Sequence, residues 1–322
     1  MLWRRSSAAG GGIVGVAAVS RVAAIALACA VTLYASPAAA WGELGHRVSA
    51  LIAYERLTPV AKARIERLLQ QGKDDAGEPD FVDSSVWADR LRFTEPEINS
   101  AAWHLADYPL NWTGSFASCP GPQRAIRSKV PTRIPAPDAG CLVSKLAESQ
   151  RTLAERRPDP RALKFLMHLI ADAHQPLHAA TNADQGGECV KLIGSKGMAD
   201  SNLHAYLDTT LVRSLGGSPE RIAASLRAGI RPTDVAAWTG AGPAEGPDGW
   251  IAAWTRESHA LALRIYASIP PGIGCRSVRA LPPAAESEAR RIVAMQLTKG
   301  GVRTAHVLNR LFDPSYAGPG SP

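Results

Sequence analysis

The sequence of 322 residues lacks most features of membrane, repeat or thiolate-metal proteins. After its first 40 residues it has no apolar run near the roughly 20 residues that a membrane-spanning helix needs. No unit of roughly 20–50 residues repeats, which argues against a solenoid. Its five cysteines include no Cys-x-x-Cys pair, so a zinc site built from thiolates is not expected. Convincing alternating strands are also scarce.

The first 40 residues lack acidic side chains but contain three arginines. An apolar run of about a dozen residues (22–33) and an A-x-A pattern at 38–40 follow. This predicts a signal peptide, residues 1–40, that is removed before Trp41 from a secreted or periplasmic protein. A membrane anchor, a twin-arginine signal and a lipoprotein signal at Cys29 fit less well. Without the three arginines the formal net charge falls from +7 to +4, which permits an anionic substrate without requiring one.

Helical periodicity dominates the rest of the chain and predicts an all-α protein with a single helical domain, residues 41–313. Helices are expected over 43–57, 84–93, 141–157, 161–174, 202–215, 250–268, 284–298 and 301–312. Ser84 is the expected cap of the second of these. Asp159 and Pro160 would start the fourth, and Pro176 would follow its end. The piece 188–194 could pair as a strand, and the tail 314–322 is expected to be disordered.

Four cysteines follow the predicted cleavage point, and an exported chain favours disulfides. Four cysteines allow three sets of pairs, of which we expect Cys119–Cys141 with Cys189–Cys275. The first pair would close a proline-rich loop that contains four basic side chains. That loop is either solvated or forms a rim that attracts anions.

Two histidine–aspartate pairs with the same spacing lie on predicted helices: His168 with Asp172, and His204 with Asp208. A spacing of four puts both side chains on one helix face. Neutral imidazole and carboxylate suit zinc. A single pair is a weak signal, because a surface ion pair or a satisfied core histidine has the same pattern. Two pairs, with further histidines and aspartates in matching contexts, favour metal binding.

Other candidates lie near these pairs or near the predicted N-terminus. His178 follows a helix-ending proline and can face a different metal from His168. His104 and Asp89 each lie close to a tryptophan. His46 lies five residues after the cleavage point, so the α-amine and carbonyl oxygen of a terminal Trp41 could chelate a metal beside it.

In their order along the chain, these motifs resemble those of the S1/P1 nuclease family, which are secreted zinc-dependent nucleases. The motifs are WGELGH (41–46), WAD (87–89), WHLAD (103–107), FLMHLIADAHQPLH (165–178) and NLHAYLD (202–208). The resemblance implies a helical fold of the S1/P1 nuclease and zinc phospholipase C type, and three zinc ions. The implied ligands are Asp89, His104, His168 and Asp172 for one ion; Trp41 (backbone N and O), His46 and Asp172 for the second; and His178, His204 and Asp208 for the third.

The resemblance also implies an activity. Single-stranded DNA and RNA, and 3′-nucleotides, would be hydrolysed to 5′-phosphate products by a zinc-bound hydroxide. Asp89 and Asp172 would be catalytic through the ions they hold, and Arg92 would neutralise charge on the phosphate. Asp107 matches a carboxylate that reads a base edge. Leu105 stands where the family often has an aromatic that stacks on the base.

The chain departs from the family pattern at other positions too. Tyr108 or Trp112 could compensate for Leu105. Glu188 stands where the family usually has Asn, which adds negative charge near the site. Ala171 replaces a Gly and Leu207 a Trp. None of these changes removes an implied ligand.

Two other functions compete with the nuclease hypothesis. A zinc-dependent phospholipase C has a similar fold and metal cluster, but Arg92 and Asp107 argue against it. A non-catalytic exported protein that binds zinc or nucleic acid is the other, and the complete ligand set argues against it. We expect a monomer with no stable protein partner and no membrane contact after cleavage. His174, His259 and His306 are expected to be structural.

Overall fold

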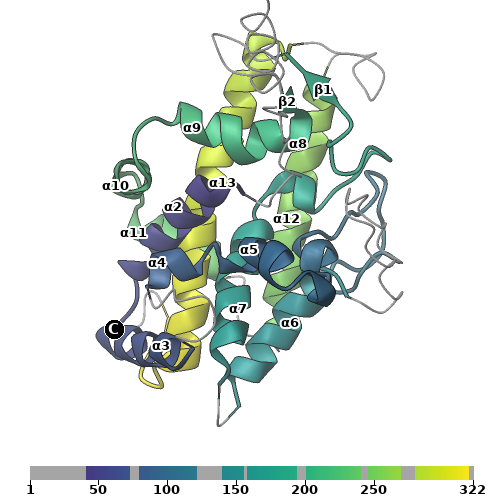
Figure 1. The fold of residues 1–322 in the computed structure, drawn as a ribbon. Helices are drawn as coiled ribbons and strands as arrows, with labels where there is room; N and C mark the ends of the chain where they lie inside the picture. Colours follow the sequence, from purple (N-terminus) through teal and green to yellow (C-terminus); the bar gives the residue numbers. More distant parts are fainter. Residues whose placement is uncertain are drawn as a thin grey trace, which may run out of the picture. The chain divides into compact units, whose positions relative to one another are not determined.

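The computed structural model describes residues 41–72, 80–121, 140–155, 158–193, 201–240, 246–269 and 280–318. The predicted signal peptide lies outside these ranges. The described residues form helices and one small antiparallel sheet (Figure 1), in which β1 (Lys191–Leu192) pairs with β2 (Ser201–Asn202). The all-α prediction is therefore confirmed, and part of the piece 188–194 pairs as expected. No helix in these ranges is both long and apolar enough to cross a membrane.

Helices follow one another along most of the described chain. They are α2 (Glu43–Tyr54), α3 (Pro59–Gln71), α4 (Phe81–Ser84), α5 (Trp87–Thr94), α6 (Leu142–Leu153), α7 (Pro160–Asp172), α8 (Leu203–Ala205), α9 (Val212–Ser214), α10 (Pro219–Ala228), α11 (Pro232–Thr239), α12 (Gly246–Ser268) and α13 (Pro283–Phe312). Three 3-10 helices, η1 (Pro96–Ile98), η2 (Ser100–His104) and η3 (Pro176–His178), and the π-helical segment η4 (Tyr206–Leu211) lie between them.

Helix α13 is continuous where the sequence analysis expected two helices, so that prediction was wrong. Gly300 and Gly301 lie inside it, where they allow α2 to approach closely. A Cβ on Gly301 would lie 2.6 Å from Cβ of Ile52 and 2.7 Å from the carbonyl oxygen of Ser49. The Ser49 hydroxyl also donates to the carbonyl of Leu297 at 3.0 Å. Gly301 therefore serves helix packing, and neither glycine ends the helix.

The expected helix 84–93 is also interrupted, because Ser84 belongs to the separate helix α4 and residues 85–86 form a turn before α5. Asp80 caps α4 by accepting from the backbone amides of the next turn. Ser84 ends α4, and α5 begins at Trp87, so Ser84 is not the cap we expected. Ser85 lies between the two helices, and its carbonyl oxygen accepts from Nδ1 of His168 at 2.7 Å.

Helix α7 begins as predicted, with Asp159 accepting from the amide of Arg161 at 2.8 Å and Pro160 in the first position. It packs against α5, α6 and α13. The helix is buried from Leu166 to its last residue, Asp172. Polar side chains in this half therefore have to find partners inside the protein.

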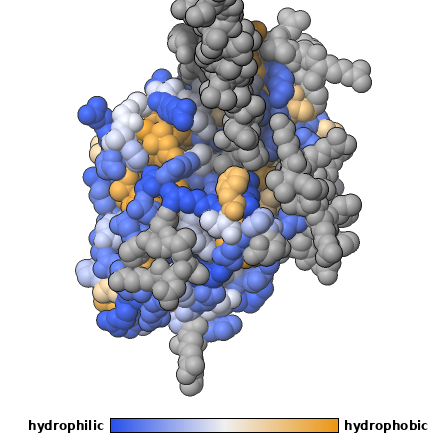
Figure 2. Space-filling model, viewed as in Figure 1, coloured by the Kyte–Doolittle hydropathy of each residue, from blue (hydrophilic) through white to orange (hydrophobic). Residues whose placement is uncertain are grey.

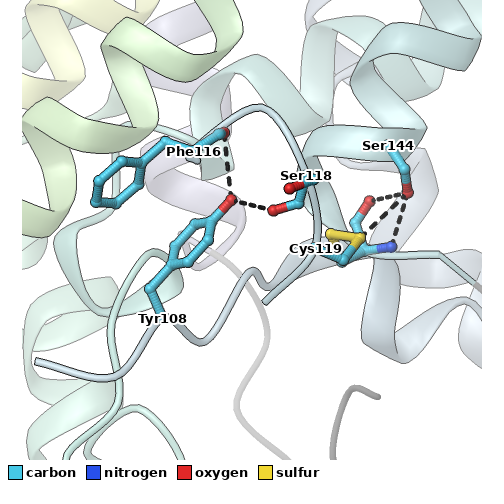
Figure 3. The surroundings of a disulfide bond; sticks show 6 residues. Tyr108, Phe116, Ser118, Cys119 and Ser144 are labelled. Atoms are coloured by element: carbon cyan, nitrogen blue, oxygen red, sulfur yellow. Dashed lines mark hydrogen bonds between the residues drawn. A yellow bond between two sulfur atoms is a disulfide. The ribbon is translucent and has the colours of Figure 1, made fainter. Parts of the chain in front are cut away.

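The Cys119–Cys141 disulfide is present, as predicted. Beside it the Ser144 hydroxyl accepts from the amide of Cys141 (Figure 3). The basic part of the loop that this disulfide closes, residues 122–139, lies outside the described ranges. Cys189 is disulfide-bonded as well. Its expected partner, Cys275, is outside those ranges.

Part of the predicted tail is placed. Tyr316 is partly buried, and its hydroxyl lies 3.2 Å from Nδ1 of His306. Residues 319–322 lie outside the described ranges, so disorder stays a prediction for them. The face shown in Figure 2 is largely hydrophilic, with separate hydrophobic areas. The exposed large hydrophobic side chains of the described ranges are Val60, Phe93, Ile193, Leu263 and Met295.

Candidate metal centre

The structure brings the eight side chains expected to bind metal into three groups of possible ligands, two of which share His168. The groups are Asp89, His104 and His168; His46, His168 and Asp172; and His178, His204 and Asp208. Their atoms come from α2, α5, η2, α7, η3, α8 and η4. Except for Asp89, which is 9% exposed, each of these residues is at most 2% exposed. Segments far apart in the sequence therefore meet at one buried polar centre.

One group has the dimensions of a tetrahedral zinc site. Oδ2 of Asp172 lies 3.0 Å from Nδ1 of His104 and 3.3 Å from Nε2 of His168, and these two nitrogens are 3.0 Å apart. Oδ1 of Asp89 lies 3.9 Å from each nitrogen. Ligands bound at about 2.0–2.1 Å in a tetrahedron are separated by roughly 3.3 Å. The four atoms are therefore close to the spacing that zinc needs.

The other carboxylate oxygen of Asp172 faces a second pair of histidines. Oδ1 lies 3.4 Å from Nε2 of His46 and 3.6 Å from Nδ1 of His178. The rings of His46 and His168 stack with centroids 3.7 Å apart. Asp172 is completely buried. Its two oxygens thus point at different histidine pairs, which is the arrangement expected of a carboxylate that bridges two cations.

Trp41 lies next to this part of the centre. It is fully buried, and its indole NH donates to the carbonyl of Ala171 at 2.8 Å. The amide of Gly42 donates to the carbonyl of Asp208 at 3.1 Å. The start of the described chain is therefore held against the segments that carry Asp172 and Asp208. The metal-binding role of the Trp41 amine and carbonyl stays a prediction.

The third group is built on the second histidine–aspartate pair. Nε2 of His204 lies 3.2 Å from Oδ2 of Asp208, and Nε2 of His178 lies 4.0 Å from Oδ1 of Asp208. The two imidazole rings stack with centroids 5.0 Å apart. The side-chain amide of Gln175 donates to Oδ1 of Asp208 at 2.6 Å and fixes that carboxylate.

Backbone carbonyls orient two of the histidines. Nδ1 of His168 lies 2.7 Å from the carbonyl of Ser85, and Nδ1 of His204 lies 2.8 Å from the carbonyl of Gly186. An N–H on Nδ1 leaves Nε2 as the free lone pair that faces the carboxylates, as in many metal sites. Neither contact could be predicted from the sequence, because any residue type supplies a backbone carbonyl.

Gly186 belongs to a turn that Asp184 and Tyr266 organise. Residues 183 and 185–187 all have positive φ, between 57° and 88°. The Asp184 carboxylate accepts from the amides of Asn182 and Gly187 at 3.0 Å and from the Tyr266 hydroxyl at 2.9 Å. This turn was not among the sequence predictions, although Asn, Asp and Gly, which favour such conformations, are concentrated there.

Burial is the largest influence on the titration of the centre. It lowers the pKa of His46, His104 and His178 well below the ordinary value, and neighbouring histidines add to this effect. These imidazoles are therefore neutral, which is the form that binds metal. Burial raises the pKa of Asp172 to about 7, although His168 acts in the opposite direction. A charged Asp172 thus requires nearby positive charge.

The two histidines paired with carboxylates respond differently. Burial alone would lower the pKa of His168, but attraction to Asp172 and Asp89 raises it overall. In the same way Asp208 outweighs burial and raises the pKa of His204 to about 9. Each of these histidines therefore sits in a negative field that also suits a metal cation.

Unpaired buried atoms support the same interpretation. Within the described ranges no hydrogen-bond partner is present for Nε2 of His46, either nitrogen of His178 or Oδ1 of Asp172. A buried polar atom without a partner costs about 1–3 kcal/mol. Metal cations would coordinate these atoms, and imidazole with carboxylate is a donor set that zinc prefers. The residues present therefore fit a zinc centre.

Two further predicted site residues lie beside the groups. Nη2 of Arg92 donates to Oδ1 of Asp89 at 3.0 Å, and the Arg92 side chain is 13% exposed. Asp107 has φ 44°, and a Cβ on Gly186 would lie 3.5 Å from its Oδ1. Arg92 is therefore next to the first group, and Asp107 is next to the turn that supports the third. The phosphate and base contacts assigned to them stay predictions.

The expected compensation for Leu105 by Tyr108 does not fit the structure. Leu105 is 9% exposed, and Tyr108 is fully buried. The Tyr108 hydroxyl lies 2.7 Å from the carbonyl oxygen of Ser118 and 3.2 Å from that of Phe116 (Figure 3). Trp112 is partly buried and packs against the Tyr108 ring at 5.4 Å. Tyr108 is therefore a core residue and cannot stack on a base.

None of the three groups found among the described residues contains His174, His259 or His306. Nδ1 of His174 lies 2.7 Å from the carbonyl of Ile170, and its Nε2 accepts from Arg303 at 2.8 Å. His259 contacts the carbonyl of Pro109 at 2.9 Å. Their contacts agree with the structural roles expected for these histidines.

Taken with the helical fold, this geometry defines a class of protein: a helical protein whose buried histidines and carboxylates can hold more than one metal ion. The S1/P1 Nuclease family matches residues 41–313, and the chain belongs to this family. Similar proteins include Nuclease P1 from Penicillium citrinum and Nuclease PA3 from a Penicillium species, each 23% identical over 290 residues, or 86% of this chain and 100% of the relative. Endonuclease 1 from Arabidopsis thaliana is 25% identical over 306 residues, or 86% and 88%.

Proposed function

We propose that this protein is a zinc-dependent nuclease that hydrolyses single-stranded DNA and RNA, and 3′-nucleotides, to products with 5′-phosphates. The observation that carries the proposal is Asp172, whose two buried oxygens face separate histidine pairs beside a third ligand group. Membership of the S1/P1 Nuclease family supports it, and so do the relatives named nucleases and endonucleases.

The proposal assigns three zinc ions to the centre. Asp89, His104, His168 and Asp172 would hold one, the backbone of Trp41 with His46 and Asp172 a second, and His178, His204 and Asp208 the third. Zinc bound in this way supplies positive charge for a phosphate and lowers the pKa of a water molecule to about 7.

The remaining chemistry belongs to the chain's own side chains. The Arg92 guanidinium, beside Asp89, would orient the phosphate and neutralise its charge. Asp107 would accept hydrogen bonds from the edge of an unpaired base. Neutral His46, His104 and His178 keep their lone pairs for coordination, because burial lowers their pKa. Asp184 and Tyr266 would hold the turn that orients His204.

A preference for single strands is expected from the burial of the centre. Most of its ligands are at most 2% exposed, so a phosphate has to enter a recess to reach them. A stacked duplex keeps its bases paired, whereas an unpaired strand can turn its bases outward against protein groups. The proposal therefore includes single-stranded nucleic acid as substrate, and a monomeric exported protein that starts at Trp41.

The first test uses purified protein that starts at Trp41. Zinc per chain would be counted by elemental analysis, and release of 5′-nucleotides from single-stranded DNA and RNA would be assayed on the same sample. We expect about three zinc ions and hydrolysis that a chelator abolishes. Three zinc ions with hydrolysis of a choline phospholipid but not of nucleic acid would favour the phospholipase C alternative. Zinc without any hydrolysis would favour the non-catalytic binding protein.

The proposed role of the Trp41 amine has its own test. A matched form that keeps Ala40 before Trp41 has an amide in place of the terminal amine. We expect it to bind about one zinc ion fewer and to lose most activity. Equal zinc content and activity in the two forms would remove Trp41 from the ligand set and leave the other eight residues in place.

A further inference from the structure

Phe93 is exposed to an unusual degree for its type. Its exposed fraction is 70%, and it is the sole aromatic among the exposed large hydrophobic residues of the described ranges. It lies near the end of α5, whose other hydrophobic side chains, Trp87, Ala88 and Leu91, are buried. A single exposed hydrophobic side chain is ordinary on a protein surface, so the position of Phe93 beside the metal centre has to carry the argument.

The position of Phe93 connects it to the metal centre. The guanidinium carbon of Arg92 lies 6.0 Å from the centroid of the Phe93 ring. The same guanidinium donates to Asp89 at 3.0 Å. Phe93 therefore follows Arg92 on α5, the helix that supplies Asp89, and is the more exposed of the two side chains. A strand whose phosphate contacts Arg92 would bring the next nucleotide toward this ring.

Other rings near the centre are not available for the same contact. The position of Leu105, where the family often has an aromatic, supplies no ring in this chain. Tyr108 and Trp87 are buried. Trp103 is partly buried, with the Lys145 ammonium 4.3 Å from its ring centroid and the Phe165 ring 5.3 Å away. Within the described part of the chain, Phe93 is thus the exposed ring that lies nearest to the proposed phosphate contact along α5.

We propose that Phe93 is a stacking platform for an unpaired base, in the nucleotide adjacent to the one whose phosphate reaches Arg92. The inference rests on the proposed function, which places the phosphate at Arg92, and adds a second base contact for substrates longer than one nucleotide. Every base has a face that stacks on an aromatic ring, so this contact is tolerant of sequence. It strengthens binding of oligonucleotides without acting on 3′-mononucleotides.

The test measures binding and kinetics separately on zinc-loaded protein. Binding of a fluorescent phosphorothioate oligothymidylate, which resists hydrolysis, is followed by anisotropy. Phe93→Ala is expected to weaken binding roughly 5- to 150-fold, the range for loss of one base stack of about 1–3 kcal/mol. Phe93→Trp should keep or increase affinity. Val60→Ala removes an exposed side chain from α3 and serves as the control that leaves binding unchanged.

Two comparisons separate stacking from a general loss of structure. An abasic strand of the same length should bind the parent protein and Phe93→Ala equally, because it has no base to stack. In steady-state assays Phe93→Ala should raise KM for an oligonucleotide, with kcat and zinc content unchanged, and should leave both constants unchanged for a 3′-mononucleotide. Unchanged oligothymidylate binding in Phe93→Ala, or an equal loss on the abasic strand, would overturn the inference.

The failures of the two proposals are distinguishable. Hydrolysis by the parent protein with no effect of Phe93→Ala would leave the nuclease proposal standing and remove the stacking role. Base-dependent binding that needs Phe93, without hydrolysis of any strand, would keep the stacking role and overturn the nuclease proposal. Failure of the parent protein to bind single strands would overturn both.

Discussion

The two histidine–aspartate pairs make nearly the same contact on different backbones. Nε2 lies 3.3 Å from a carboxylate oxygen in His168–Asp172 and 3.2 Å in His204–Asp208. The first pair lies on the regular helix α7, whereas the second spans α8 and the π-helical segment η4. The spacing of four therefore brings the two groups together in both settings, and the differences lie in what surrounds each pair.

The surroundings make the pairs vulnerable to different changes. Asp172 presents its oxygens to four histidines, so its loss affects two groups at once. Asp208 has a side-chain amide on one oxygen, and His204 depends on a turn of residues with positive φ. The first pair is thus central to the cluster, and the second depends on its support.

Loss of the shared carboxylate should have the largest effect. We expect Asp172→Asn to lower zinc content by about two ions per chain, because two groups lose an anionic ligand, and to lower activity by more than about 100-fold, beyond the usual loss from an outer contact. Asp208→Asn is the matched control and should remove about one ion. Elemental analysis with an assay on single-stranded DNA checks both. Equal losses in the two variants would contradict the shared role of Asp172.

The turn that supports the second pair should be sensitive to one methyl group. Gly186 has φ 61°, and a Cβ there would lie 2.8 Å from the carbonyl oxygen of Leu177. Gly186→Ala should displace the carbonyl that orients His204 and weaken one zinc site about 10- to 100-fold. The control is Gly216→Ala, at φ 87° with no atom within 4 Å of the added Cβ. Zinc titration compares the zinc affinities of the two variants. An equal loss of affinity in both would mean that the positive φ, and not the contact with Leu177, causes the effect.

A smaller effect is expected where α2, which carries His46, meets α13. Gly301→Ala would place its Cβ 2.6 Å from Cβ of Ile52, so we expect a loss of about 1–3 kcal/mol in the free energy of unfolding from overpacking. At Gly300 the nearest atom would be the Ser49 hydroxyl at 3.4 Å. Gly300→Ala should therefore be neutral or stabilising by up to about 1 kcal/mol, since Ala favours a helix. Urea unfolding compares the two; equal destabilisation would contradict the packing argument.

The smallest effect concerns the ionic support behind α7. Arg303 donates to His174, two residues after Asp172, and to Glu257. Burial would raise the pKa of Glu257, but Arg303 and Lys299 outweigh it and lower the pKa to about 2. A carboxyl with a lowered folded-state pKa stabilises the protein above its unfolded pKa, about 4.3, and loses this contribution as the pH falls toward 2.

Glu257→Gln should therefore lower the free energy of unfolding by about 1–2 kcal/mol at pH 7. The difference from the parent should shrink between about pH 4.5 and 2. Urea unfolding of chelator-treated protein measures this without metal loss. Glu288→Gln is the control, because Glu288 pairs with Arg264 and Arg291 at the surface, where such pairs contribute less than about 1 kcal/mol. A difference at Glu257 that does not change with pH would contradict the assignment.

The sequence predicted what depends on side-chain type. The helical class, the Cys119–Cys141 disulfide and the start of α7 follow from periodicity, composition and capping residues. The eight side chains that the resemblance to the S1/P1 nuclease family implies as ligands do meet, although spacing alone indicated only the pairs His168–Asp172 and His204–Asp208. Their actual occupancy by zinc, and the roles of Arg92 and Asp107, stay predictions.

Features that depend on packing could not be predicted in the same way. The carbonyls of Ser85 and Gly186 orient histidines, and any residue type supplies such a carbonyl. A break was expected between 284–298 and 301–312, whereas α13 is continuous there and Gly301 contacts α2. Tyr108 looked available for a base until its burial was known. Tertiary context decided each of these cases.

The packing of α2 on α13 also determines when the centre can form. Thr58, just after α2, bonds through its amide to Asn309 at 2.8 Å and through its hydroxyl to Asp313 at 2.6 Å. These contacts join residues about 250 positions apart, so they cannot form before α13 has been synthesised, and contacts of such separation are slow to form. A chain still being synthesised would have His46 long before the helix that holds α2 in place. We therefore expect the centre to bind metal only after synthesis of α13 is complete. A chain shortened before α13 should be unable to assemble the site.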